Sequence, residues 1–580
     1  MRILGIHDGH TSTACLLEDG TVVAMASEER FSRVKSCGGI PYRAVEWVLN
    51  HGGGGPAGRE IDGVAVVGLA EPMGQDDQDL QTLRHTYFSK AAEYLPERIL
   101  GSQRLVQSYL ALRGRKRAHL TQLRQLLKKF SISEEKFHLV EHHEAHAAAA
   151  YYTSWYRNDR EPLLIITLDG SGDGICGTVS IGSGVEMERR LAIPAYHSLG
   201  EMYTRVTQFL GMKPLEHEYK VMGLAPYAPE KLAERAYTVF SRYLRLSEDG
   251  RSFVNTSKSW GESFLKRLQH DLAMVRFDAV AAGIQRQMEE LVVRYILNWV
   301  RFTNIHNVAV GGGCFMNVKV NMLLAQLKEI ERIFFFPSCG DESIALGGAL
   351  RVYAALCKER GQAPRFLPLQ SLYYGPEYSD AEIEEVLGEY HERVSHERVS
   401  NVEEVTARLL AHNKIIGRLW GRMEWGARAL GNRSILSDPR NLANLRRLNA
   451  AIKMRDYWMP FAPSILWERR HDYLVNPTDL PAPYMILAFE STELARRELV
   501  AALHPSDLTC RPQLVQEEWN PPYYRLLRHF EELTGCGGLL NTSFNLHGDP
   551  VVCSPRDAIE TLLHSGLDYV TIGNYLISRR

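Results

Sequence analysis

The feature that most constrains the fold is a pattern of strands and turns that occurs twice in this 580-residue chain. At 2–26 an apolar strand leads into an Asp8-Gly9-His10 turn and then a hairpin, and 163–184 repeats this order around a Gly-rich turn at 169–174. Short apolar runs separated by Asp-Gly and Gly turns are typical of antiparallel hairpins. We therefore predict an α/β protein with an internal structural repeat. The alternative is a chance similarity of two hairpins.

Charge and cysteine content narrow the class of protein. Lys and Arg number 67 and Asp and Glu number 69, so a net charge of −2 gives no reason to expect nucleic acid or a membrane as partner. The N-terminus runs straight into a patterned strand instead of a signal peptide. Nine cysteines lack a CxxC pair. These features predict a reduced, cytoplasmic protein without a structural zinc ribbon.

The rest of the chain divides into two domains. A Pro- and Gly-containing stretch near 361–375 has linker composition, so we expect domains at 1–365 and 366–580, each with its own core. Leucines at helical spacing within 77–137 predict an inserted helical layer between the two repeat copies. The size and apolar content are those of an ordinary globular protein.

Two histidines and two aspartates are candidate metal ligands. His142 and His146 are four residues apart at the start of an Ala-rich helix, so their imidazoles lie on one helical face. Asp169 follows an apolar strand and Asp341 precedes a helical segment. Two imidazoles with two carboxylates favour Fe(II), Mn(II) or Zn(II) over Mg or Ca. The alternatives are a packed or surface histidine pair and aspartates that serve as turn or N-cap residues.

A basic stretch in the second domain predicts an anion pocket. The phrases at 421–434 and 452–463 combine Gly, Pro, Trp and Phe with five cations: Arg422, Arg428, Arg433, Lys453 and Arg455. A solvated charged surface is rarely so rich in aromatic residues and glycine. Arg presents a planar fork that matches phosphate and carboxylate oxygens, and Lys adds a point charge. The stretch therefore points to phosphate chemistry.

Three further features are weaker alone. The Gly-rich phrase at 311–317 follows an apolar strand, as many phosphate-binding turns do. Lys220 is either a phosphate contact or a surface lysine. His10 has a side chain suited to general-base catalysis, although a lone turn histidine usually has no such role.

Taken together, these phrases resemble the ATP-dependent O-carbamoyltransferases of natural-product biosynthesis, including tobramycin and nodulation-factor carbamoyltransferases. The resemblance covers essentially the whole chain. Its phrases begin at His10, Glu28, His142, Asp169, Lys220, Gly311, Arg422 and Asn541. It implies an N-terminal duplicated actin/hexokinase-like domain, similar to the tRNA threonylcarbamoyltransferase, and a C-terminal YrdC-like α/β domain.

The resemblance also implies a reaction. Carbamoyl phosphate and Mg-ATP give carbamoyl-adenylate in the second domain, and a hydroxyl of a small-molecule natural product then accepts the carbamoyl group in the first. By motif, His10 resembles the catalytic base, and an iron(II)-type metal is implied at His142, His146, Asp169 and Asp341. Nucleotide contacts are implied at Lys220, Gly312, Asn317 and Asn321. Carbamoyl phosphate and ATP contacts are implied at Arg422, Arg428, Lys453, Arg455, Arg511 and Asn541. A homodimer is expected by analogy with the family alone.

The sequence departs from the family in two phrases. Ala427 replaces the more usual Pro, and Asp507-Leu508 replaces Asp-Gly, which affects the backbone that directs Arg511. Two other classes remain open: a fused tRNA threonylcarbamoyl enzyme, and a sugar-kinase-like nucleotide-binding module. The acceptor is not identified by the sequence.

Overall fold

The computed structural model describes residues 1–51, 60–69, 102, 115–158 and 160–580, so most of the predicted 77–137 insertion lies outside the described residues. The contacts divide the chain into two units. The N-terminal unit comprises Met1–Glu28 and Ser36–Leu369, and the C-terminal unit comprises Glu29–Lys35 and Gln370–Arg580. Among the described residues no helix is both long and apolar enough to cross a membrane. All nine cysteines are described, and each is a free thiol.

The N-terminal unit contains two five-stranded sheets with the same topology. One has the order β3-β2-β1-β4-β5 and the other β8-β7-β6-β11-β12. In each, a three-stranded antiparallel meander continues into two strands parallel to its first strand. The predicted repeat is therefore present. The strands are β1 (Arg2–His7), β2 (Thr13–Glu18), β3 (Thr21–Ser27), β4 (Gly63–Val67), β5 (Phe137–Val140), β6 (Leu163–Gly172), β7 (Ile175–Ser183), β8 (Glu186–Pro194), β11 (Asn307–Gly311) and β12 (Arg332–Phe335).

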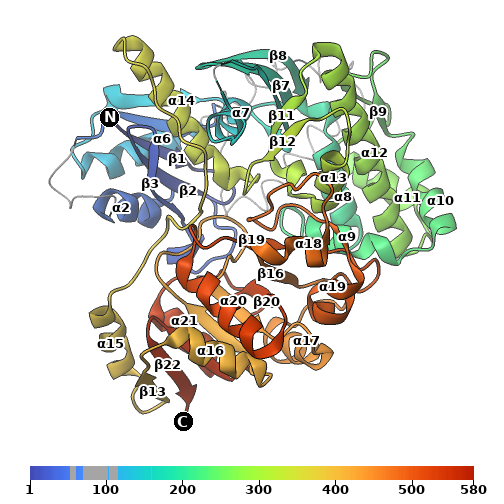
Figure 1. Ribbon diagram of the computed structural model, residues 1–580. Helices are drawn as coiled ribbons and strands as arrows, with labels where there is room; N and C mark the ends of the chain where they lie inside the picture. The colour runs from blue at the N-terminus through green and yellow to red at the C-terminus, as the bar shows by residue number, and fades with distance from the viewer. Residues whose placement is uncertain (52–59, 70–101, 103–114, 159) are drawn as a thin grey trace. The chain divides into compact units, whose positions relative to one another are not determined.

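Two helices pack on these sheets and against each other. α14 (Ile344–Glu359) lies on β1 and β4, and α7 (His142–Tyr152) packs on β6 and β11 (Figure 1). A Cβ on Gly347 of α14 would stand 1.8 Å from the carbonyl oxygen of Ala145 in α7. The small residues of α7 and this glycine therefore let the two backbones approach closely, which fixes the height of α7 above its sheet.

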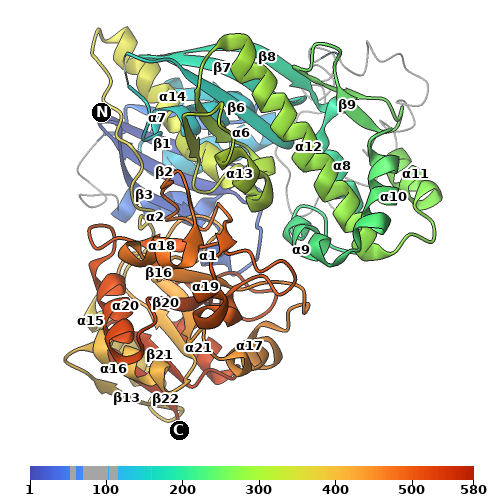
Figure 2. The same ribbon diagram turned by 45° about the vertical axis from the view of Figure 1, so that its right-hand side comes forward.

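Several of the remaining helices of this unit pack around one long helix. α12 (Phe277–Thr303) packs against α8 (Leu199–Phe209), α10 (Glu230–Phe240) and α13 (Val318–Ala325) (Figure 2). The other helices are α2 (Tyr42–His51), α6 (Arg115–Lys128), α9 (Glu218–Leu224) and α11 (Glu262–Asp271). Leu123, Leu126 and Leu127 of α6 are buried, so the leucine spacing predicted this helix correctly.

The C-terminal unit is built on one mixed sheet of eight strands. Its order is β13-β22-β21-β14-β15-β20-β16-β19. The strands are β13 (Val394–Arg398), β14 (Ile416–Leu419), β15 (Arg433–Ser437), β16 (Ala462–Leu466), β19 (Gln513–Val515), β20 (Gly538–Ser543), β21 (Tyr569–Ile572) and β22 (Tyr575–Arg579). Its helices include α15 (Asp380–Glu389), α16 (Val402–Ala411), α17 (Leu442–Leu448), α20 (Pro521–Thr534) and α21 (Pro555–Leu563). Apolar side chains from α15, α21 and the central strands form a buried core.

A short segment from near the N-terminus belongs to this second unit. α1 (Glu29–Ser32) and the residues up to Lys35 group with the C-terminal unit by their contacts. Arg33 donates to the carbonyl oxygens of Val551 and Pro550 at 2.6 and 3.0 Å. The C-terminal unit is therefore discontinuous in sequence.

Candidate functional site

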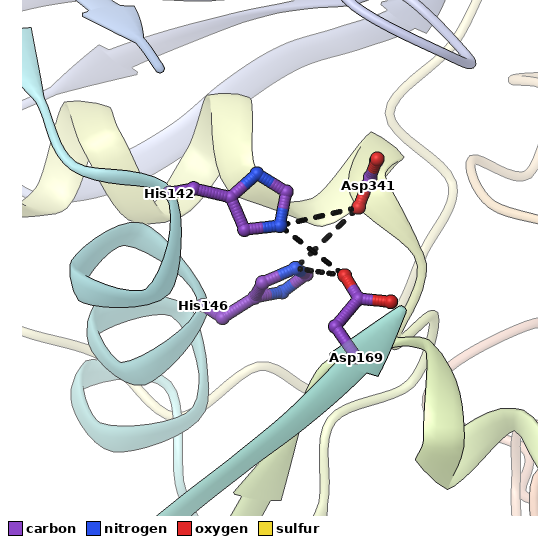
Figure 3. Close-up of side chains that lie close together, drawn as sticks. All are labelled: His142, His146, Asp169 and Asp341. Atoms are coloured by element: carbon purple, nitrogen blue, oxygen red, sulfur yellow. Dashed lines mark hydrogen bonds and ion pairs between the residues drawn. The ribbon is translucent and has the colours of Figure 1, made fainter. Parts of the chain in front are cut away.

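Four predicted metal ligands converge in the N-terminal unit. His142 and His146 project from α7, Asp169 from β6, and Asp341 from the single turn before α14. Figure 3 shows both imidazoles and both carboxylates pointing toward one another. The Nε2 atoms of His142 and His146 each lie 3.2 Å from Asp169 Oδ2. They lie 3.6 and 3.5 Å from Asp341 Oδ1.

This geometry fits a single divalent ion. Ligand atoms about 2.1 Å from one ion are separated by roughly 3.0–3.4 Å at right-angled to tetrahedral spacing. The two separations from Asp169 Oδ2, at 3.2 Å, fall in this range, those from Asp341 Oδ1 are slightly longer, and all four ligand atoms lie within 4.8 Å of one another. His146 Nδ1 is 3.2 Å from Ser343 Oγ, and this contact directs Nε2 toward the carboxylates. The donor set of two imidazoles and two carboxylates suits iron, manganese or zinc.

The charges in the cluster also favour a cation. Burial lowers the pKa of His142, but the carboxylates of Asp341 and Asp169 outweigh it and raise that pKa to about 10. Burial raises the pKa of Asp169, and the two imidazoles overcome it and hold that pKa well below its usual range. Two partly buried carboxylates this close together favour positive charge beside them, from protons or from a metal ion.

The neighbouring residues of α7 have other roles. His143 is buried, with Nδ1 2.9 Å from Thr167 Oγ1 and Nε2 3.2 Å from the carbonyl oxygen of Ile175, so it holds α7 to its sheet. Glu144 forms an ion pair with Arg351 at 2.6 Å. Asp169 differs from its predicted setting, because β6 continues through it to Gly172 and the turn follows at Asp173 and Gly174.

His10 lies in the middle of the β1–β2 turn, and this turn is held by a histidine that the sequence reasoning missed. His7 Nε2 donates to the His10 carbonyl oxygen at 2.9 Å. Burial lowers the pKa of His7 to about 4, although the nearby Asp341 carboxylate opposes this shift. His7 is therefore a neutral imidazole beside the metal-ligand cluster. Its position at the end of β1 was the available signal.

Three of the four predicted nucleotide contacts belong to the turn after β11 and the helix that follows it, and the fourth lies on α9. Gly312 has a φ of +94°, and a Cβ there would stand 2.3 Å from the Leu168 carbonyl oxygen, so the turn requires glycine. Asn317 caps α13 by accepting from the backbone N–H groups of Lys319 and Val320. Asn321 is buried and donates to the Phe315 carbonyl oxygen at 2.8 Å. Lys220 is partly buried on α9.

A second cluster, of cations, lies in the C-terminal unit. Burial, then the charges of Arg428 and Arg455, hold the pKa of Arg511 well below its usual range. Burial, and then the charges of Arg455 and Lys35, also hold the pKa of Lys453 well below its usual range. The Lys453 ammonium donates to oxygens of Ser543 and Asn545 at 2.5–3.2 Å. Cations gathered at this density create an electrostatic demand for an anion.

We call Lys35, Arg428, Lys453, Arg455 and Arg511 the cation cluster. Sequence reasoning missed Lys35, which is far from the others in the chain and reaches them because Glu29–Lys35 packs into this unit. The available signal was that Arg30 and Arg33 stand just before Lys35 in the sequence.

Three other predicted residues support this region through the backbone. Arg422 donates to the carbonyl oxygens of Tyr374 and Gly375 at 2.7 and 3.4 Å. Arg433 is fully buried and donates to five backbone carbonyl oxygens. Asn541 donates to the Ala429 carbonyl oxygen at 3.3 Å and also to Ser464 Oγ at 2.9 Å. These side chains shape the walls around the cation cluster.

Comparison with known proteins places the chain in a family. Residues 2–350 match the carbamoyltransferase N-terminus and residues 407–579 match the carbamoyltransferase C-terminus. This protein therefore belongs to the carbamoyltransferase family, and is a transferase.

Named relatives agree with this assignment. The chain is 31% identical to nodulation protein NolNO of Sinorhizobium fredii, over 99% of this chain and 79% of that protein. It is 32% identical to nodulation protein NolO of Bradyrhizobium diazoefficiens, over 76% of this chain and 79% of that protein. An uncharacterised protein of Synechocystis is 31% identical over 100% of this chain and 97% of its own length.

Similarity to solved structures is weaker. A structure of full-length HypF in its phosphate- and nucleotide-bound form aligns with a TM-score of 0.32 and 11% identity, over 62% of this chain and 56% of that one. At that TM-score the likeness supports no inference about this chain.

Proposed function

We propose that this protein is an ATP-dependent O-carbamoyltransferase that acts through carbamoyl-adenylate. The observation that carries the proposal is the cation cluster, in which burial, and then the charges of Arg428 and Arg455, depress the pKa of Arg511. Carbamoyl phosphate and ATP are both polyanions, and their approach to one another requires clustered positive charge. Family membership supplies the carbamoyl group as the group transferred.

The first reaction belongs to the C-terminal unit, whose fold we infer to be YrdC-like. Carbamoyl phosphate and water give carbamate and phosphate. A carbamate oxygen then displaces pyrophosphate from the α-phosphorus of ATP, which gives carbamoyl-adenylate. The five side chains of the cation cluster bind the phosphate groups and lower the repulsion between them. The buried walls around Lys453 and Arg433 limit bulk water to what the cleavage of carbamoyl phosphate consumes, and this protects the adenylate from hydrolysis.

The second reaction belongs to the N-terminal unit, whose repeated sheets we infer to be actin/hexokinase-like. The acceptor hydroxyl oxygen attacks the carbamoyl carbon, the bond from that carbon to the adenylate oxygen breaks, and AMP leaves. His10 takes the hydroxyl proton, and His7 holds the turn that carries it. His142, His146, Asp169 and Asp341 would hold a divalent metal, which when bound supplies Lewis-acid polarisation of a carbonyl or phosphate oxygen.

The binding of AMP in this unit involves the turn after β11. Gly312 lets the backbone approach the phosphate closely, and Gly313 leaves space beside Asp169, because a Cβ there would stand 2.8 Å from Asp169 Oδ1. Lys220, Asn317 and Asn321 complete the nucleotide side in this proposal, with the asparagines acting through the shape of the turn that they hold.

The test is product analysis of metal-loaded protein by mass spectrometry. The protein is incubated with ATP and ¹³C-labelled carbamoyl phosphate, without acceptor. Labelled carbamoyl-adenylate, together with pyrophosphate and phosphate, is the expected result. A parallel incubation with threonine and bicarbonate separates the tRNA-modification alternative. Threonylcarbamoyl-adenylate as the product, or no adenylate from either mixture, would refute the proposal.

A further inference from the structure

The loop that carries Arg428 has no regular secondary structure, so side chains must determine its shape. It joins β14 to β15 and covers 420–432. Arg428 is part of the cation cluster, where the charges of its neighbours repel it. In a loop without anchors, such a side chain would move away from the cluster. Something in the C-terminal unit must therefore oppose that repulsion.

The carboxylate of Glu424 binds the backbone of this loop at three points. Its Oε1 accepts from the N–H groups of Leu430 at 2.6 Å, Asn432 at 3.3 Å and Arg433 at 3.1 Å. The side chain is 3% exposed. Hydrogen bonds to a buried carboxylate are stronger than those between neutral groups, and three N–H donors in one turn create a small site for negative charge. Glu424 thus fixes the C-terminal half of the loop.

Other side chains hold the carbonyl oxygens of the same turn. The Leu430 oxygen accepts from Tyr373 Oη and Gln513 Nε2, both at 2.8 Å, and the Gly431 oxygen accepts from Arg418 Nη1 at 3.1 Å. Gly431 has a φ of +110°, and a Cβ there would stand 2.4 Å from the ring of Tyr523. The turn is therefore held on both its N–H and its carbonyl side.

The residues before Arg428 are also anchored. Arg30 Nη2 donates to the Gly426 carbonyl oxygen at 3.0 Å, from the segment that joins this unit from the N-terminus. Arg428 lies between this anchor and the turn bound by Glu424, so its backbone is held from both sides. A cation placed in advance where an anion will bind costs no rearrangement when the anion arrives.

We propose that Glu424 is a positioning residue that holds the 420–432 loop so that Arg428 faces the anion bound by the cation cluster. Glu424 acts through the backbone and does not touch the anion. The inference rests on the proposed function for the identity of that anion, carbamoyl phosphate. Its structural part, that one carboxylate orders the loop, is independent of the reaction.

The experiment compares Glu424→Gln and Glu424→Ala with wild type and with a matched control. Asp438→Asn is the control, because Asp438 is an equally buried carboxylate of the same unit whose partner is Arg440, at 2.6 Å. Two quantities are measured for each protein: the exchange of backbone amides in peptides covering 425–434, and KM and kcat for carbamoyl phosphate from pyrophosphate release. Affinity for inorganic phosphate is measured alongside.

Glu424→Ala is expected to speed amide exchange within 425–434 and to raise the KM for carbamoyl phosphate about ten- to a hundredfold. Glu424→Gln keeps an acceptor oxygen without its charge, so it should give smaller changes in the same direction. Asp438→Asn should leave both quantities at the wild-type value. Phosphate affinity should fall in the order wild type, Gln, Ala.

Three outcomes would overturn the inference. One is unchanged exchange and unchanged KM in Glu424→Gln, which also decides the matter if Glu424→Ala does not fold. Another is faster exchange spread over the whole unit, and the third is an equal rise in KM in Asp438→Asn. A wild-type protein that releases no pyrophosphate refutes the proposed function instead, and the exchange and phosphate measurements still test the role of Glu424.

Discussion

Replacing Arg511 by methionine is expected to separate stability from activity in the C-terminal unit. The guanidinium donates to the Met485 carbonyl oxygen at 3.3 Å, and a bond of this kind is worth about 1 kcal/mol net. Against it, burial and the charges of Arg428 and Arg455 depress the pKa of Arg511. Two like charges 4 Å apart repel by about 1 kcal/mol in water and about 4 kcal/mol near a protein surface.

Two cationic neighbours, each repelling Arg511 by about 1 kcal/mol in water, already outweigh the hydrogen bond of about 1 kcal/mol that the substitution removes. Methionine keeps the apolar stem that packs in the wall. We therefore expect Arg511→Met to raise the free energy of unfolding by about 1 kcal/mol, or about 2–4 °C in Tm for a unit of this size. The gain should shrink as salt is added, since salt screens the repulsion that the substitution removes.

Activity should change in the opposite direction. Loss of one preorganised charge at a transferring phosphate costs about 10²- to 10³-fold in rate, measured here as pyrophosphate released from ATP and carbamoyl phosphate. Inorganic phosphate should raise the Tm of wild type by mass action and that of Arg511→Met much less.

The matched control is Arg408→Met. Arg408 pairs with Glu404 on the exposed face of α16, so its loss should cost under about 1 kcal/mol and leave pyrophosphate release unchanged. A lower Tm in Arg511→Met together with an undiminished phosphate response would refute the account of the cation cluster.

Three further predictions follow from single sites. Leu508 adopts a φ of +57° where the family phrase has Gly, so Leu508→Gly should stabilise the protein by about 0.5–1 kcal/mol in urea unfolding; a loss of stability would contradict this. Burial, and then the charges of Arg455 and Lys35, hold the folded pKa of Lys453 well below its usual 10.5, so the cost of its charge is full below the folded pKa and is relieved as pH rises from there toward 10.5; wild type should therefore gain stability relative to Lys453→Met as the pH is raised toward 10.5. Because carboxylates raise the pKa values of His142 and His146, binding of a divalent ion near pH 7 should release roughly one to two protons, detected by calorimetry in buffers of different ionisation enthalpy; no release would contradict the ligand set.

The sequence predicted the strands and the repeat well because hairpin turns and apolar alternation are local signals. The meanders of the two sheets follow from such patterns, and the leucine spacing indicated α6 in the same local way. The metal-ligand cluster was harder, because Asp341 meets His142 only after α7 and α14 pack together. Its ligand types and their positions beside predicted elements were the signals that the sequence offered.

Composition identified the basic stretch but not which of its cations would form the cation cluster. Arg422 and Arg433 lie in the same phrase as Arg428, yet the first two donate to backbone carbonyl oxygens. A sequence does not distinguish an arginine that faces a ligand from one that folds a loop, because both occur among glycine and aromatic residues. Lys35 was missed for another reason: its segment leaves one unit and packs into the other.

The central claim is that two separate sites in one chain make and then use carbamoyl-adenylate. The most direct test is isotope exchange between pyrophosphate and ATP that depends on carbamoyl phosphate, measured without acceptor in wild type, His146→Ala and Arg428→Ala. We expect exchange in wild type and in His146→Ala, which should fail only in carbamoyl transfer, and no exchange in Arg428→Ala. Exchange that is lost in His146→Ala or retained in Arg428→Ala would contradict the assignment of the two reactions to the two units.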